Sequence, residues 1–335
     1  MIFWLHDRGE LRDVVVSSRI RLARNLDNYK FPIKIESDEA KQVYDDIIRL
    51  LDNGKFTHFR IKDIPIIERN MLVEKHIISP ALLHTPNISG FAMSEKEDQT
   101  IMINEEDHIR IQVLDSGLSL SKAWARADEL DNQLESSLRY AYDEKVGYLT
   151  SCPTNLGTGL RASVMLHLPA LEMTKEINKV LTTISQFGLA IRGVYGEGTK
   201  ALGSLYQISN QSTLGDNEET IIKKIDHLTR QIAEKERITR KNIFEKNTFG
   251  FEDKIFRAYG ILKNARIIST EEAVRLISFL KLGISSGLIT GNNINDMDKL
   301  FIEIQPASLQ YISRIEMNDM ERDIKRAEVI RNIIN

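Results

Sequence analysis

The sequence predicts a mixed α/β domain followed by a mainly helical domain. Alternating apolar residues between Ile101 and Val113 indicate strands, and apolar faces in residues 121–138 and 177–184 indicate helices. After about Lys235 the chain is rich in lysine, arginine, glutamate and isoleucine and carries few strand signals. We therefore expect one domain over residues 1–240 and a helical C-terminal domain over residues 241–335.

The expected elements follow in chain order. A short β-branched strand begins at Val14 and runs into SSRIRLARN, and residues 101–113 form two strand-like arms around an acidic corner. LAIRGVYGEG indicates a strand followed by a glycine-rich turn, SLYQISNQ a further strand, and the sequence from Ile221 a long helix. In the C-terminal part, EEAVRLISFLKLGIS and NDMERDIKRAEVIRNII have helical periodicity.

Composition excludes several functional classes. The 335 residues are 42% hydrophobic and 28% charged with a net charge of −3, so bulk binding of nucleic acid is not expected. A single cysteine excludes an internal disulfide framework and fits the reducing cytoplasm. The N-terminal apolar run is too short for a signal peptide, and no apolar stretch reaches the length of a membrane span. We expect a cytoplasmic protein with no membrane or nucleic-acid partner.

Arginines are the first candidate site residues. We expect them in or beside turns and strand ends of the first domain, converging on one cleft, where their planar donor forks would hold a phosphate chain. The chain contains no GxxxxGK[ST] motif, so such a cleft would work without a Walker loop. For any single arginine, an ordinary surface position is the better interpretation. The residues concerned are Arg19, Arg21, Arg110, Arg161 and Arg192.

The segment SCPTNLGTGLRASVMLHL is the most informative stretch of the chain. Gly157 and Gly159 allow a sharp turn and a close approach to an anion, and Arg161 supplies positive charge, so we interpret it as a phosphate-gripping turn. Gly157, Gly159 and Ala162 also fit the dinucleotide pattern GxGxxA. That alternative requires a βαβ unit with a later acidic residue at a strand end, and we rank it below the phosphate turn.

Residues 104–107, NEED, form the second constellation. Glu105, Glu106 and Asp107 repel one another unless a cation lies among them, and a metal, an arginine clamp and a cationic substrate are all compatible. An ordinary acidic turn is the alternative. Glu197, in the glycine-rich turn, is a candidate second carboxylate, and the pair could bracket a guanidinium and accept its proton as it attacks phosphorus.

Two single residues complete the candidates. His76 is expected to touch a nucleotide, although a packed or surface histidine is at least as common. Cys152 opens the glycine-containing turn beside the arginines, where a thiolate facing a substrate or a small buried side chain is possible.

Together, SSRIRLARNL, NEEDHIRI, CPTNLGTGLRASV and RGVYGEG resemble the signature set of the phosphagen (guanidino) kinases, in that family's order and over residues 14–240. The resemblance implies an α+β fold with a central antiparallel sheet flanked by helices, Mg-ATP as donor, Mg²⁺ without direct protein ligands, and a guanidinium acceptor. It assigns catalysis to Glu106, with Glu105 near it, Glu197 on a closing loop, and Cys152 beside the substrate. It implies nucleotide contacts from Ser17, Ser18, Arg19, Ile20, Arg21, His76, Arg110, Arg161, Ala162, Ser163, Val164, Met165, Arg192, Gly193, Val194, Tyr195, Gly196 and Glu197.

Two departures from the small-molecule guanidino kinases point to the protein-arginine kinase branch. About a dozen residues precede the first motif, so we expect no helical cover over the acceptor pocket, and a helical C-terminal domain is added. RDIKRA resembles that branch's RDxxRA phosphoarginine pocket, which implies allosteric binding by Arg322, Asp323, Arg326 and Ala327. From spacing alone, a solvated helix face is the better interpretation of this motif.

The leading hypothesis is therefore an ATP-dependent protein-arginine kinase, activated by phosphoarginine, that marks proteins for Clp degradation in the stress response. The resemblance implies protein substrates with exposed arginines, including a heat-shock repressor, a Clp ATPase/protease, an activator protein, and a homodimer formed through the C-terminal domain. A kinase for free arginine or another small guanidine is the second hypothesis. A degradation adaptor that acts by binding, without catalysis, is the third.

Overall fold

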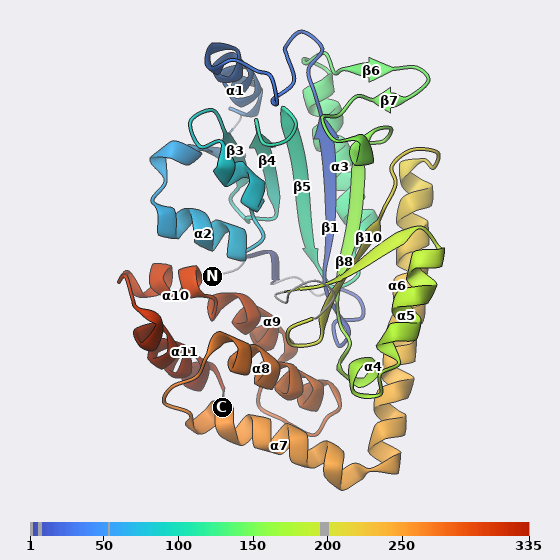
Figure 1. Cartoon of the computed structure of the whole chain (residues 1–335), viewed down its shortest axis with the longest axis vertical. Helices are drawn as coiled ribbons and strands as arrows, with labels where there is room; N and C mark the ends of the chain where they lie inside the picture. The colour runs from blue at the N-terminus through green and yellow to red at the C-terminus, as the bar shows by residue number, and fades with distance from the viewer. Residues whose placement is uncertain (1–2, 6–8, 53, 195–200, 335) are drawn as a thin grey trace.

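The structure is a computed structural model that describes residues 3–5, 9–52, 54–194 and 201–334. A large sheet occupies one half of the molecule, and the C-terminal helices pack beneath it (Figure 1). Within the described residues, no helix combines the length and apolar character that a membrane span requires.

The sheet has eight strands in the order β2-β3-β4-β5-β1-β8-β10-β9, and every neighbouring pair is antiparallel. This confirms the predicted α+β class with a central antiparallel sheet. The two central strands are β5 and β1, and β8 lies next to β1; β1 carries the arginine motif and β8 continues from the glycine-containing motif. The bounds are β1 Val15–Arg24, β2 Phe56–Arg60, β3 Gly90–Ser94, β4 Gln99–Ile103, β5 Ile109–Ser116, β8 Leu160–His167, β9 Leu189–Gly193 and β10 Leu205–Asn210. A separate hairpin pairs β6 (Tyr142–Asp143) with β7 (Gly147–Tyr148).

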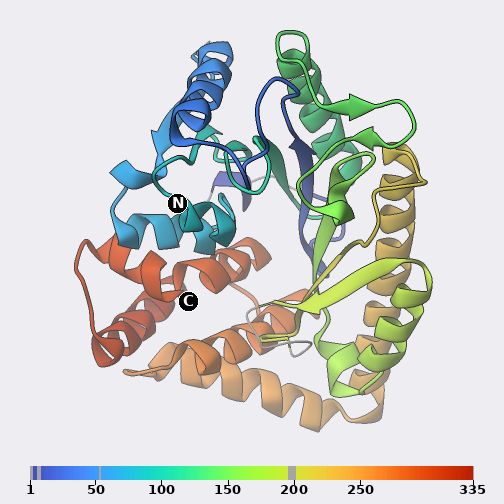
Figure 2. The ribbon, with the colours of Figure 1, turned by 45° about the horizontal axis from the view of Figure 1, so that its top comes forward.

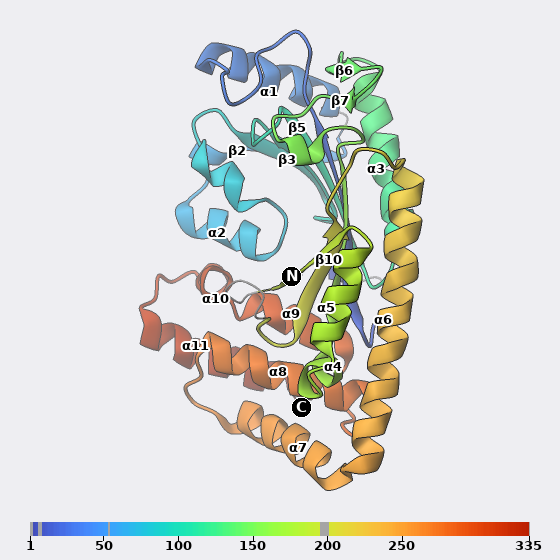
Figure 3. The same cartoon turned by 45° about the vertical axis from the view of Figure 1, so that its right-hand side comes forward.

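Helices cover one face of the sheet. The long helix α6 (Glu218–Lys246) and α3 (Leu120–Glu135) run along this face (Figure 3). In β1, Ile20 and Leu22 point into the core between sheet and helices and are fully buried. Because side chains alternate along a strand, Arg19 and Arg21 must point to the opposite face. This second face, which we call the arginine face, carries the candidate site.

Apolar stripes hold these helices on the sheet. In α3, Ala123, Ala127, Leu130 and Leu134 recur every three to four residues and are all buried, as the sequence predicts. Truncation of one such leucine to alanine costs about 2–5 kcal/mol in a well-packed core. The remaining helices of the first domain are α1 Ser37–Leu51, α2 Ile66–Glu74, α4 Pro169–Met173 and α5 Ile177–Gln186.

The C-terminal part is helical, as predicted. Its helices are α7 Thr248–Asn264, α8 Thr270–Ser285, α9 Ile294–Glu303, α10 Pro306–Ser313 and α11 Asp319–Ile333. They enclose a second core that also contains Val16, Met165 and Leu205 from the sheet, so the helical part packs directly against the sheet. The predicted boundary at residue 240 falls inside α6, whose first half packs on the sheet and whose end, at Ile243 and Phe244, contacts this second core.

Candidate active site

The strand register places the candidate arginines on one face. Arg21 lies directly opposite Arg161 of β8 and Gln112 of β5, and Arg19 lies opposite Ser163. Arg192 of β9 lies opposite Gln207 of β10. The prediction that the arginines lie in turns or at strand ends is wrong for Arg19 and Arg21, which lie within a central strand. Long side chains from neighbouring strands therefore converge because they share a pleat.

These arginines destabilise one another's charge. Burial and the nearby Arg161 and Arg110 lower the pKa of Arg19 to about 10. Burial, Arg19 and Arg110 also lower the pKa of Arg21, well below its usual range. For Arg161, burial and then Arg192 are the main causes of a lowered pKa. A polyanion on this face would reverse these effects, because it favours the charged form of each guanidinium.

Buried donors without hydrogen-bond partners also indicate that this face binds an anion. The buried Nε atoms of Arg21 and Arg161 have no hydrogen-bond partner among the described residues. Arg19, by contrast, donates to Gln207 Oε1 at 3.0 Å, and Arg161 Nη2 donates to Ser209 Oγ at 3.3 Å. Buried donors in folded proteins are almost always paired, so two unpaired guanidinium nitrogens on adjacent strands indicate an anion site.

A cavity of about 220 Å³ joins this anion site to the acidic corner and the glycine-containing turn. It is lined by Arg21, Leu22, Ala23, Glu106, Arg110, Cys152, Thr154, Asn155, Gly159 and Arg161. The structure thus brings Arg21, Arg110 and Arg161 together with Glu106 and Cys152, whereas the other two predicted arginines, Arg19 and Arg192, do not line this cavity. A phosphate chain and a cationic acceptor could meet within this one cavity.

The two glutamates of the acidic corner have different environments. The Glu105 side chain is 0% exposed and accepts hydrogen bonds from Arg110 Nη1, at 2.7 Å, and from Ser79 Oγ. The Glu106 side chain is 40% exposed and pairs with Arg110 Nη2 at 2.7 Å. Of the cations compatible with the sequence, the structure shows the arginine clamp, formed by Arg110. Glu105 is occupied in holding Arg110, whereas Glu106 faces the cavity and can receive a substrate.

The last carboxylate of the corner joins three segments. Asp107 Oδ1 accepts from Asn25 Nδ2 and from the Ser151 backbone N–H, both at 2.7 Å. Burial raises the pKa of Asp107. Because Ser151 precedes Cys152, this carboxylate fixes the cysteine-bearing turn beside Glu106. Within the described residues, no group of three His, Cys, Asp or Glu side chains could hold a metal ion.

The glycine-containing turn packs against β1. A Cβ at Gly159, which has a φ of +64°, would lie 2.6 Å from the Ala23 carbonyl oxygen and 2.5 Å from Arg24 Nη1. Glycine is therefore required there for close packing, in addition to any approach to an anion. The GxGxxA alternative is wrong, because the residues after Gly159 form the antiparallel strand β8 and no helix follows the glycines.

Cys152 is half-buried at the cavity wall, and its Sγ lies 3.0 Å from Thr154 Oγ1. Arg161 lies close enough for the sulfur to influence its pKa. The cysteine therefore faces the same cavity as Glu106, and its role in catalysis stays a prediction.

His76 lies at the side of the arginine face. Burial and the nearby Arg19 lower its pKa to about 3, so the imidazole is neutral at physiological pH. Gln112 Nε2 donates to the carbonyl oxygens of His76 and Ile77 at 2.8 and 2.9 Å. The sequence analysis missed Gln112, although its position two residues after Arg110 in a strand-like pattern assigns both to the same face.

Other predicted nucleotide residues point elsewhere. Ile20, Ala162 and Val164 lie in the core between sheet and helices, so their side chains do not line the cavity. Ser18 Oγ is buried and donates to the Gly117 carbonyl oxygen. The motif therefore mixes residues that line the site with alternating residues that hold the strands in the core.

The remaining members of these motifs have mixed positions. Ser163 Oγ accepts from Arg19 Nε at 3.4 Å, whereas Met165 packs in the second core and Ser17 is buried. Gly193 and Val194 follow Arg192. Tyr195, Gly196 and Glu197 lie outside the described residues, so the assignments made for them stay predictions.

The RDIKRA motif lies on α11. Arg326 is 1% exposed, donates from Nε to the Ile304 carbonyl at 2.9 Å and from Nη1 to the Ile268 carbonyl at 2.8 Å, and pairs with Asp323. Ala327 is buried beside it. Arg322 donates to the Met317 carbonyl at 2.7 Å and pairs with Asp319. Phosphoarginine binding at this motif stays a prediction.

Comparison with known proteins agrees with this geometry. The model of the ATP:guanido phosphotransferase C-terminal catalytic domain matches residues 39–239, and that of the protein-arginine kinase McsB C-terminal domain matches residues 249–335. Among solved structures, lombricine kinase is 24% identical with a TM-score of 0.60, covering 68% of this chain and 67% of its own, which supports the fold. The duplicated taurocyamine kinase from Schistosoma mansoni with bound transition state analog components is 26% identical with a TM-score of 0.63, covering 72% and 35%.

The antiparallel sheet, the arginine face and the carboxylate corner define an ATP:guanido phosphotransferase. Two relatives extend the match to the whole chain. The protein-arginine kinase of Halothermothrix orenii is 46% identical, over 99% of this chain and 96% of that protein. The protein-arginine kinase of Bacillus subtilis (strain 168) is 43% identical, over 98% and 92%. The chain belongs to the protein-arginine kinase family.

Proposed function

We propose that this protein transfers the γ-phosphoryl group of ATP to arginine side chains of proteins. The observation that carries the proposal is one cavity lined by Arg21, Arg161 and Glu106, where the Nε atoms of both arginines have no hydrogen-bond partner among the described residues. One end suits a phosphate chain and the other suits a guanidinium.

The arginine face would hold the nucleotide. Arg21 and Arg161, which line the cavity, would donate guanidinium N–H groups to phosphate oxygens, and the bound negative charge would relieve the repulsion among the guanidinium groups. Positive groups fixed in advance also stabilise charge that develops on the phosphoryl oxygens during transfer. Mg²⁺, carried by the nucleotide, would neutralise part of the same charge.

Glu106 would orient the acceptor. An incoming guanidinium would take over part of the ion pair that Glu106 makes with Arg110, while Glu105 and Ser79 keep Arg110 in place. A terminal guanidino nitrogen then bonds to the γ-phosphorus as the bond to the ADP oxygen breaks, and the nitrogen's proton passes to Glu106. The products are ADP and an N-phosphorylated arginine.

A protein-borne arginine fits this end of the cavity. Glu106 is 40% exposed, and Pro153 and Thr154 of the adjacent turn are exposed, so a side chain projecting from another protein can reach the carboxylate. The full-length relatives are named protein-arginine kinases. A kinase for free arginine remains the second candidate, because the same carboxylate would orient a small guanidine.

The test is incubation with Mg-ATP and either free arginine or an unfolded protein, followed by mass spectrometry for acid-labile phosphate on arginine. We expect modification of the protein, and a loss of about 10²–10⁴-fold in rate for Glu106→Gln without loss of folding. Glu129→Gln, an exposed carboxylate on the helix-covered side, is the matched control. Phosphorylation of free arginine alone would overturn the choice of substrate. An unchanged cellular effect of Glu106→Gln would favour an adaptor that acts by binding.

We further propose the wider role that the family resemblance suggests. Modified proteins would pass to a Clp protease in the cytoplasm during stress, a heat-shock repressor would be among them, and an activator protein and phosphoarginine would stimulate the enzyme. A homodimer through the C-terminal helices is supported by the exposed apolar residues of the α10–α11 region. These residues are Tyr311, Ile312, Ile315, Met320 and Ile324. Analytical ultracentrifugation of an Ile315→Glu variant tests the dimer.

A further inference from the structure

Glu74, the last residue of α2, clamps the start of a C-terminal helix. Its carboxylate accepts from the backbone N–H groups of Ala307 and Ser308, at 2.9 and 2.6 Å, and from Ser308 Oγ at 2.7 Å. These are the first free N–H groups of α10, so a carboxylate here also interacts favourably with the helix dipole. Helices α2 and α10 lie side by side in Figures 1 and 2 although more than 230 residues separate the bonded groups.

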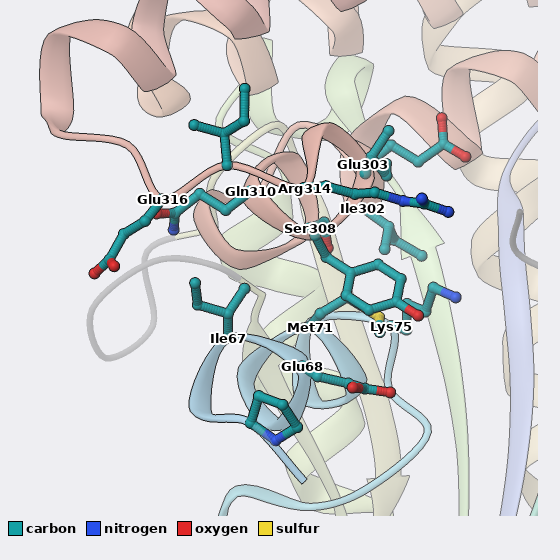
Figure 4. Close-up of a pocket in the computed structure, with 14 residues that line it drawn as sticks. Ile67, Glu68, Met71, Lys75, Ile302, Glu303, Ser308, Gln310, Arg314 and Glu316 are labelled. Atoms are coloured by element: carbon teal, nitrogen blue, oxygen red, sulfur yellow. The ribbon is translucent and has the colours of Figure 1, made fainter.

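Packing beside the clamp is incomplete. A cavity of about 480 Å³ separates the outer parts of α2 and α10, with Met71 and Lys75 on one side and Ser308 on the other (Figure 4). Beside the cavity, Ala307 packs with Met71 and Leu72 in one buried apolar cluster. The polar clamp therefore adds to this apolar contact in fixing the start of α10 relative to α2.

The chain that follows Glu74 enters the candidate active site directly. His76 adopts a left-handed conformation, with a φ of +60°, which turns the chain sharply at the end of α2. Gln112, opposite Arg21 in the sheet, holds the His76 and Ile77 carbonyls, and Ser79 bonds Glu105. The segment 76–79 is thus attached to Gln112 of the arginine face at one end and to Glu105, the partner of Arg110, at the other.

The far side of α10 is attached to the RDIKRA motif. Arg326 donates to the carbonyl of Ile304, two residues before α10 begins, and its charge also acts on the Glu74 carboxylate. A continuous set of contacts therefore runs from α11 through the start of α10 and Glu74 to the His76–Ser79 segment.

We propose that Glu74 is a positioning residue for phosphoryl transfer: by clamping α10 it fixes His76 and Ser79 for nucleotide binding. The inference rests on the proposed function only in taking ATP as the donor. It identifies α10 as the element through which the C-terminal helices act on the nucleotide site.

The experiment measures the Kd of Mg-ATP by calorimetry for the full-length protein. Glu74→Gln places an amide donor against the N–H donors of α10, and we expect the Kd to rise about tenfold, as a typical coupling between sites. Ser308→Ala removes one of the three bonds and should raise it about threefold. Glu68→Gln, on the same helix and outside the clamp, is the matched control and should change the Kd less than about twofold.

A second background separates positioning from general destabilisation. His76→Asn keeps a side chain that tolerates the left-handed backbone. If Glu74 acts through His76, Glu74→Gln should weaken Mg-ATP binding little further when His76→Asn is already present. The Glu74→Gln single variant should also remain fully folded at the temperature of the calorimetry, so that partial unfolding does not explain its higher Kd.

A wild-type Kd of Mg-ATP in Glu74→Gln would overturn the proposal. So would a double variant in which the fold-changes in Kd of Glu74→Gln and His76→Asn multiply, because the two residues would then act independently. Should Glu74→Gln fail to fold, Ser308→Ala decides by the same criteria. The calorimetry contains Mg-ATP and no phosphoryl acceptor. A failure to phosphorylate protein arginine would therefore refute the proposed function without changing the measured effect of Glu74 on Mg-ATP binding.

Discussion

Two groups of arginines in this protein differ in what their donors do. On the arginine face, Arg21 and Arg161 lie opposite each other, and their Nε atoms have no partner in the part of the chain that the structure describes. On α11, the donors of the buried Arg326 are directed to the carbonyls of Ile304 and Ile268 and to Asp323. In the first arrangement the guanidinium groups repel one another until an anion binds, and in the second Arg326 joins α11 to the segments that precede α10 and α8. The same residue type thus serves ligand binding in one region and structure in the other.

The sharpest test of this contrast is Arg161→Met. We expect kcat/KM for ATP to fall about 10²–10³-fold, the usual effect of removing one donor to developing charge. The unfolding midpoint should stay the same or rise, because a guanidinium repelled by Arg192 and Arg110 is removed. Steady-state kinetics and thermal unfolding check both expectations.

Arg230→Met is the control for Arg161→Met, since Arg230 makes its ion pairs on the exposed side of α6. The free energy of unfolding of Arg230→Met should differ from wild type by less than about 0.5 kcal/mol, and the variant should retain activity. If Arg161→Met were strongly destabilised while its folded fraction kept wild-type activity, Arg161 would have a structural role. The distinction between ligand-binding arginines on the arginine face and structural arginines on α11 would then fail.

Arg326→Met should show the opposite pattern. It leaves two buried carbonyls without donors and Asp323 without its partner, so the free energy of unfolding should fall by about 3 kcal/mol. Denaturant unfolding measures this loss, with Arg322→Met, whose side chain is 24% exposed, as the milder comparison. A stable Arg326→Met variant that no longer responds to phosphoarginine would instead assign this arginine to ligand binding.

The contrast also shows what the sequence could reveal. The combination of motifs predicted the sheet, the convergence of Arg21, Arg110 and Arg161 on one cavity, and the place of Glu106 beside them. It did not predict that Arg326 is buried, because the spacing of RDIKRA is the same for a solvated face and a packed one.

The alternation of side chains along a strand predicts which residues of a motif face the site. In SSRIRLAR, arginines at every second position already assign Arg19 and Arg21 to one face and Ile20 to the other. The resemblance implies nucleotide contacts from unbroken runs of residues, and these runs include Ile20, Ala162 and Val164, whose side chains lie in the core. Glu74 could not have been found, because a carboxylate at a helix end has no motif and its partners lie far away along the chain.

The smallest expected effect concerns His76, a neutral imidazole that lies beside the positive charges of the arginine face. Its pKa falls to about 3 in the folded protein, against about 6.5 when unfolded, because of burial and the charge of Arg19. The unfolded chain therefore binds a proton that the folded one does not, and stability is lost as the pH falls below about 6.5 toward 3. The slope from this group approaches about 1.4 kcal/mol per pH unit at most. Denaturant unfolding between pH 7 and pH 5 should show a shallower dependence in His76→Asn, whereas an unchanged dependence would mean that His76 is protonated on the arginine face.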